Sequence, residues 1–86
     1  MKYRTFITGA ARKDLAVLPD STRPAVVRTI DRLESGNFAN SRNLPVATPG
    51  VRLRTIRVAP SLRVVYAVDE DKQMIAIVRL EREFER

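Results

Sequence analysis

The sequence predicts an α+β domain in which one N-terminal strand and two helices precede three antiparallel strands. Apolar residues alternate with other residues on both sides of Ala59-Pro60-Ser61, a pattern that is typical of a β-hairpin. Upstream of it, apolar residues recur at helical spacing in two short segments separated by a proline-containing break. A chain of 86 residues has room for one hydrophobic core, so we interpret residues 1–86 as a single domain.

The N-terminal segment predicts a strand followed by a short helix. Lys2–Thr8 alternates as a strand does, and Gly9 interrupts it. In Ala10–Leu18 the apolar residues fall at i, i+4 and i+7, which places them on one face of a helix. Pro19 ends this helix, because the residue before a proline is pushed out of the α conformation.

A second helix is expected directly after Pro19. Asp20 or Ser21 can cap it, Pro24 falls in its first turn, and Gly36 is a plausible C-terminal stop. The residues expected to form its buried stripe are Val26, Val27, Ile30 and Leu33. The short connection favours an antiparallel helical hairpin, and each helix is too short to be stable unless it packs on the sheet.

The residues from Asn37 to Gly50 are rich in Asn, Ser, Pro and Gly, so a loop is expected there. Two of its apolar residues, Leu44 and Val46, are expected to anchor it to the core.

The second half predicts three strands joined by short turns, Val51–Ala59, Leu62–Asp69 and Gln73–Leu80, before a charged tail, Glu81–Arg86. The last strand is almost entirely apolar, so a central position in the sheet is expected. The predicted order is β-α-α-β-β-β. The N-terminal strand and the helical hairpin then pack on a four-stranded, mostly antiparallel sheet that keeps one face partly open.

Composition excludes several kinds of chemistry. The chain has no Cys and no His, so thiolate metal sites, disulfides and a histidine base are excluded, and we expect neither a metal nor a cofactor. The net charge is +6, and Lys2, Lys13 and Lys72 are the lysines, which makes 13 of the 16 basic residues arginine. Arginine can bind phosphate with two parallel hydrogen bonds, so the charge favours nucleic acid, the ribosome or an acidic protein as partner. An arginine-rich solvated surface is the alternative.

No segment has the length of a signal peptide or of a membrane span. We therefore expect a cytoplasmic protein without a membrane partner.

The hairpin from Ile56 to Val68 carries the candidate site. Alternation puts Ile56, Val58, Leu62, Val64, Tyr66 and Val68 on one face. Arg57 and Arg63 then lie side by side on the other face. Two adjacent arginines on an open sheet face predict an anion-binding site, although they could instead pair with carboxylates of the chain or of a protein partner.

The residues that carry a family resemblance extend over nearly the whole chain: Ala11, Leu15 and Leu18-Pro19, then Ile30 and Leu33-Glu34, then Ile56-Arg57-Val58, then Leu62-Arg63-Val64-Val65-Tyr66. With the predicted element order, they resemble the RelE/ParE superfamily, the toxins of type II toxin–antitoxin pairs. The resemblance implies a RelE-like fold and a cognate antitoxin whose C-terminal segment wraps the toxin and links it to operator DNA. RelE-type members are endoribonucleases that cleave mRNA on the ribosome, whereas ParE-type members inhibit DNA gyrase.

The resemblance also implies residue roles. Arg63 matches the arginine that stabilises the transition state in RelE-type enzymes, and Arg57 is expected to assist it. Arg82, or Arg79, matches a second functional arginine, and we expect Arg82 to be catalytic and Arg79 to bind RNA phosphate. Arg52 and Arg54 are expected to form a phosphate-facing or solvated stripe on the face opposite Arg57.

The expected proton-transfer residues are missing. Positions where RelE-type enzymes carry lysines are Leu53 and Thr55, and Phe84 stands near the position of a terminal Tyr or His. Tyr66 is expected to pack in the core. Carboxylates that could act as a base instead are Glu81, Glu83 and Glu85. Three functions therefore remain open: a ribosome-dependent mRNA endonuclease, a gyrase inhibitor, or an inactive toxin that serves only as antitoxin partner and co-repressor.

Overall fold

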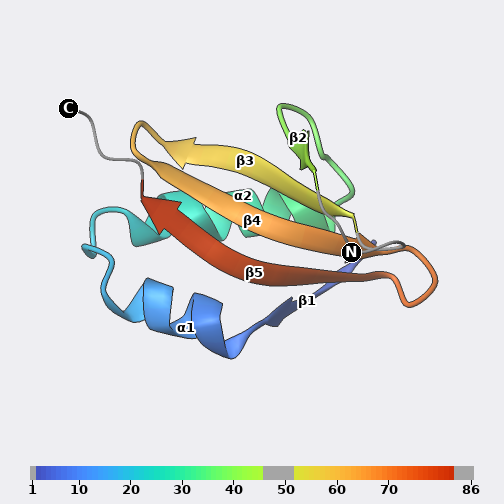
Figure 1. The fold of residues 1–86 in the computed structure, drawn as a ribbon, viewed down its shortest axis with the longest axis horizontal. Coiled ribbons are helices and arrows are strands. Elements are labelled where there is room, and N and C mark those ends of the chain that lie inside the picture. Colours follow the sequence, from blue (N-terminus) through green and yellow to red (C-terminus); the bar gives the residue numbers. More distant parts are fainter. Residues whose placement is uncertain (1, 46–51, 83–86) are drawn as a thin grey trace.

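A computed structural model of the chain describes residues 2–45 and 52–82, which form a five-stranded sheet and two helices (Figure 1). In chain order the elements are β1 (Arg4–Ile7), α1 (Gly9–Ala16), α2 (Arg23–Glu34), β2 (Arg42–Leu44), β3 (Leu53–Ala59), β4 (Leu62–Asp69) and β5 (Met74–Arg82). The predicted α+β class is confirmed, as is the order of the elements that were expected. Among the described residues, no helix has the length and apolarity needed to cross a membrane.

The sheet has the strand order β1-β5-β4-β3-β2. β1 pairs in parallel with β5, and the other neighbours pair antiparallel, as the prediction of a mostly antiparallel sheet requires. β5 lies inside the sheet, between β1 and β4. The first and last parts of the chain thus meet on neighbouring strands.

The strand count differs from the prediction, because the expected loop contains a fifth strand. Residues Arg42–Leu44 pair antiparallel with β3 and form one edge of the sheet. A three-residue strand with one apolar residue is too short to show alternation, so the hydrophobic pattern could not reveal it. Leu44 pairs with Leu53 and is only half-buried, so it does not enter the core as expected. Val46 lies outside the described residues.

α1 begins at Gly9 because Thr8 caps it. The Thr8 hydroxyl accepts a hydrogen bond from the Ala11 N–H (3.2 Å) and donates one to the Val78 carbonyl (2.9 Å). One side chain therefore caps the helix and ties its start to β5. The helix ends at Ala16, before the predicted Leu18.

α2 begins at Arg23, with Pro24 in its first turn as expected. The expected cap from Asp20 or Ser21 is wrong, since the N-cap residue is Thr22 and its side chain makes no capping hydrogen bond. Val27 was expected in the buried stripe of this helix, but it is 56% exposed, so that part of the prediction is wrong. The expected stop at Gly36 is confirmed. Gly36 has a φ of 87°, its N–H donates to the Leu33 carbonyl (2.9 Å), and the Asn37 N–H donates to the Arg32 carbonyl (3.0 Å), which is the Schellman ending of a helix.

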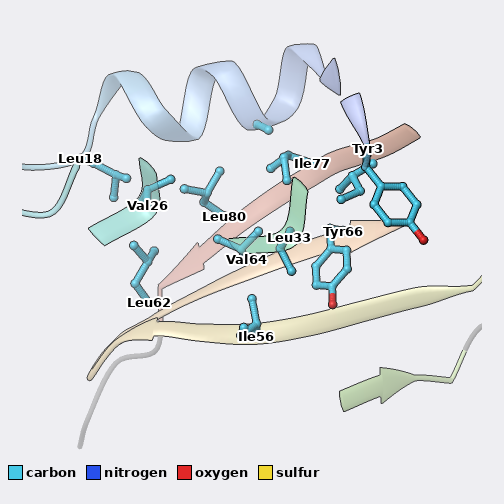
Figure 2. Packing of buried hydrophobic residues seen from close by; sticks show 12 residues of the cluster. Tyr3, Leu18, Val26, Leu33, Ile56, Leu62, Val64, Tyr66, Ile77 and Leu80 are labelled. Carbon is cyan, nitrogen blue, oxygen red and sulfur yellow. The ribbon is translucent and has the colours of Figure 1, made fainter. Parts of the chain in front are cut away.

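The core lies between the sheet and the helices (Figure 2). Its buried residues are Tyr3, Ala11, Leu18, Val26, Leu33, Ile56, Leu62, Val64, Tyr66, Ile75, Ile77 and Leu80. The alternation predicted for the hairpin is confirmed: Ile56, Leu62, Val64 and Tyr66 are buried there, and Val58 and Val68 pack against them. We call the opposite side of the sheet the outer face.

Candidate anion-binding face

Arg57, Arg63 and Glu81 lie next to one another on three adjacent strands. The register pairs Arg57 of β3 with Arg63 of β4, and Arg63 with Glu81 of β5. Their neighbours along the chain, such as Val64 and Leu80, are buried in the core. The two arginines therefore lie on the outer face, as predicted. Like charges directly opposite each other destabilise a sheet, and the carboxylate beside Arg63 offsets part of that repulsion.

A β-bulge in β5 decides which residues join this group. Val65 pairs with Arg79 and Tyr66 with Ile77, so Val78 is the extra residue. Two residues apart on a regular strand share a face, which would put Arg79 and Ile77 together. The bulge reverses the alternation, so that Arg79 and Glu81 reach the outer face while Leu80 enters the core.

A cavity of about 280 Å³ lies beside Arg63, and we call it the arginine hollow. It is lined by Arg42, Asn43, Leu44, Thr55, Arg63 and Glu81. The strand that the sequence did not reveal, β2, supplies one wall. Thr55 pairs with Arg42 across the strands, is 6% exposed, and its hydroxyl has no hydrogen-bond partner within the described part of the chain. Two arginines, a hydroxyl and a carboxylate around one hollow suit a ligand that carries both anionic and hydrogen-bonding groups.

Aromatic packing holds the chain that leads into β2. Phe38 lies between Tyr3 and Tyr66, with ring centroids 5.5 Å and 6.1 Å away. The Tyr66 hydroxyl donates to the Ser41 Oγ. Tyr66 is fully buried, which confirms that it packs in the core. These contacts fix the residues immediately before β2 and so position the β2 wall of the arginine hollow.

Arg54 and Arg52 are separated from Arg63. Arg54 pairs with Tyr66 in the register, and its guanidinium lies 5.2 Å from the centre of the Phe38 ring, on the core side of the sheet. The prediction that Arg54 alternates away from Arg57 is confirmed. Arg52 precedes β3, is exposed, and lines a smaller cavity of about 230 Å³ with Asn43.

Arg79 is engaged by α1. Its Nε donates to an Asp14 oxygen (2.9 Å), and the same oxygen accepts from the Leu80 N–H (2.9 Å). The hydrogen bond from Arg79, helped by that from Leu80, holds the pKa of Asp14 below its usual value against the opposing effect of burial. The same pairing raises the pKa of Arg79. Asp14 thus covers the edge of β5 after Ile77, where β5 no longer pairs with β1.

Arg82 lies on the other side of the sheet from Arg63. It pairs with Leu62, a core residue, and its Nη2 donates to the Val17 carbonyl at the end of α1 (2.8 Å). The structure therefore brings Arg57 and Arg63 together but places Arg82 elsewhere. Two cavities, of about 360 and 270 Å³, flank Arg82 beside Leu18.

Within the described part of the chain, Glu81 is the residue near Arg63 that could accept a proton from the substrate. Leu53 and Thr55 face outward where the resemblance implies lysines, and neither side chain can accept a proton at neutral pH. Phe84, Glu83 and Glu85 lie outside the described residues. Sequence reasoning missed Arg42 and Asn43, and the only signal for them is the register of a strand too short to predict.

Comparison of the sequence with protein-family models and with curated proteins gives no match. Comparison of the structure does. A chain of the archaeal RelE–RelB complex from Pyrococcus horikoshii OT3 is similar over all of both chains, with a TM-score of 0.83 and 24% identity. The chain has the fold of RelE toxins. This confirms the RelE-like fold expected from the sequence.

Further RelE-fold structures agree. The isolated RelE toxin of E. coli matches with a TM-score of 0.70 and 19% identity, over 98% of this chain and 87% of that one. A chain of the toxin–antitoxin complex RelBE2 from Mycobacterium tuberculosis matches with a TM-score of 0.64 and 20% identity, over 96% of this chain and all of that one. At these identities the likeness concerns the fold.

Proposed function

We propose that this chain is the toxin of a type II toxin–antitoxin pair and that it cleaves mRNA on the ribosome. The observation that carries the proposal is the row of Arg57, Arg63 and Glu81 across the outer face, beside the arginine hollow. The fold supports it, because similar structures include RelE toxins and their complexes with RelB. Such a target places its action in the cytoplasm.

The row supplies the charges that RNA cleavage needs. The ribose 2′-oxygen attacks phosphorus, the bond from phosphorus to the 5′-oxygen breaks, and negative charge builds on the non-bridging oxygens in between. Arg63 and Arg57 stabilise that charge, since a guanidinium stays protonated at neutral pH and can donate two parallel hydrogen bonds. The Glu81 carboxylate accepts the 2′-hydroxyl proton, and water protonates the leaving 5′-oxygen.

The proposed protein partner is a cognate antitoxin, whose C-terminal segment would cover the toxin and connect the pair to operator DNA. Similar structures include RelE in complex with RelB, which supports this kind of partner.

A gyrase-directed toxin of the ParE type is the second candidate. The observation that favours it is the pair Leu53 and Thr55 on the outer face, where RelE-type enzymes are expected to carry lysines. A toxin that acts without cleaving RNA would not need a base at either position.

Transcript mapping separates these functions. The chain is induced in cells without an antitoxin, and mRNA ends are mapped by primer extension with and without a translation-initiation block. Cuts in phase with codons that disappear with the block support the ribosome-dependent nuclease. Intact mRNA with gyrase-trapped DNA breaks supports the second candidate, and intact mRNA with neither supports an inactive antitoxin partner.

A further inference from the structure

An apolar row crosses the outer face on all five strands. The register aligns one residue from each strand at the same level of the sheet. From edge to edge the row is Phe6, Ala76, Ala67, Leu53 and Leu44. We call these five residues the apolar row.

The apolar row is not part of the core. None of its members belongs to the buried cluster or packs against it within the described residues. Phe6 is 53% exposed, and the other four are half-buried. The two alanines in the middle have short side chains, so the surface between Phe6 and Leu53 rises little above the backbone. The row is therefore an unpartnered strip with a solvent-exposed aromatic ring at one end.

Positive charge surrounds the row on the same face. At the next outward-facing position along the strands, toward the turn between β3 and β4, lie Arg79 and Arg42. The outward-facing position after that holds Arg63 and Arg57. Arg4 flanks the other side, and Asp69 and Glu81 are the acidic residues that the register places on this face. Basic side chains thus outnumber acidic ones around an apolar strip.

A flat apolar strip beside cations matches single-stranded nucleic acid better than a peptide helix. Unpaired bases stack on aromatic and apolar surfaces while their phosphates bind arginine. An amphipathic helix instead inserts its side chains into a groove, and the low alanine centre offers no such depth.

We propose that the apolar row stacks unpaired bases of the RNA next to the phosphate that Arg63 binds, with Phe6 as the main stacking residue. This inference rests on the proposed function and names how the same face holds its substrate. Ala67 lies four residues from Arg63 on β4, about 13 Å at the rise of a strand, and Phe6 is two strands further across, about 10 Å. The row therefore serves a nucleotide other than the cleaved one, and Phe6 is a positioning residue.

The test measures RNA binding by the purified chain, three variants of Phe6 and one control variant. Fluorescence anisotropy at low salt gives the affinity for a single-stranded RNA of about ten nucleotides, within the site sizes of such binders. Phe6→Ala and Phe6→Leu are expected to weaken binding about five-fold or more, because both remove the flat ring. Phe6→Tyr keeps the ring and is expected to bind like the wild type. The matched control is Val27→Ala, since Val27 is 56% exposed on α2 and its loss should leave binding unchanged.

A change in the ligand distinguishes a loss of base stacking from a loss of folding in the Phe6→Ala variant. An RNA of equal length that lacks bases outside the cleaved nucleotide is expected to bind the wild type and Phe6→Ala equally. Equal binding of intact RNA by the wild type and Phe6→Ala, or no binding by the wild type, would overturn the proposal. So would a Phe6→Ala variant that binds RNA normally but loses affinity for the antitoxin, because the row would then be a protein-docking surface.

The outcome is separable from that of the proposed function. Phe6-dependent RNA binding by a chain that does not cleave mRNA supports the stacking role and contradicts the nuclease. Cleavage by Phe6→Ala with unchanged KM and kcat contradicts the stacking role and leaves the nuclease intact. A raised KM at unchanged kcat supports both.

Discussion

Replacing Asp14 by alanine is expected to lower the free energy of unfolding by about 2–3 kcal/mol at pH 7. The Asp14 carboxylate accepts hydrogen bonds from the Leu80 N–H and from Arg79, both at 2.9 Å. A hydrogen bond to a charged group contributes about 1.5–3 kcal/mol, and an exposed ion pair adds at most about 1. In a domain of this size, that loss corresponds to a fall in Tm of roughly 8–24 °C.

Asparagine at position 14 separates the two contributions. Asp14→Asn keeps an oxygen that can accept from the Leu80 N–H but loses the charge. Its expected cost is therefore about half that of Asp14→Ala, or roughly 1 kcal/mol. Asp31→Asn on the exposed side of α2 is the matched control and is expected to change stability by less than about 0.5 kcal/mol.

The pH dependence gives the sign of the effect. The folded-state pKa of Asp14 lies below its unfolded value, so its charge stabilises the protein above the unfolded pKa of about 3.9. This stabilisation is lost as the pH falls through the folded-state pKa. Urea unfolding followed by circular dichroism should show the gap between wild type and Asp14→Asn closing below about pH 4. A gap that stays constant down to about pH 2 would refute the reasoning.

Three further predictions concern single positions. Gly36→Ala should lower the free energy of unfolding in urea by about 1–2 kcal/mol, because residue 36 has a positive φ. Gly9→Ala is the control and should be neutral or stabilising, because its added Cβ meets open space. Equal effects of the two substitutions would contradict the helix-ending role of Gly36. Thr55→Val should raise stability by about 1 kcal/mol, since it removes a buried hydroxyl without a described partner, and a loss of stability would show that this hydroxyl is paired. Tyr66→Phe should lower the free energy of unfolding by about 1 kcal/mol, because it removes the hydrogen bond to Ser41. The rate of RNA cleavage should stay unchanged. A large loss of cleavage would show that the Tyr66 hydroxyl takes part in catalysis.

The hairpin from Ile56 to Val68 could be predicted from sequence because its information is local. Alternation and a turn fix which side chains share a face, and the structure places Arg57 opposite Arg63 accordingly. The helix ending at Gly36 was equally local, since one glycine with positive φ decides it.

The rest of the site depends on pairing between distant segments. β2 exists because Arg42–Leu44 lies beside β3, and nothing in three residues reveals that neighbour. The bulge at Val78 sends Arg79 and Glu81 to the outer face, and strict alternation predicts the reverse. The family resemblance grouped Arg82 with Arg63, but Arg82 pairs with a core residue instead. The arginine hollow therefore could not be built from the sequence.

The proposed role of Arg63 is to stabilise the transition state of mRNA cleavage from the outer face of the sheet. It is tested most directly by single-turnover cleavage of mRNA on purified ribosomes, comparing wild type, Arg63→Ala and Arg28→Ala, whose arginine is exposed on α2. Arg63→Ala is expected to lower the rate of the chemical step about 10²–10³-fold, with thermal stability and antitoxin binding kept, and Arg28→Ala is expected to cleave like the wild type. Cleavage by Arg63→Ala at the wild-type rate would contradict it.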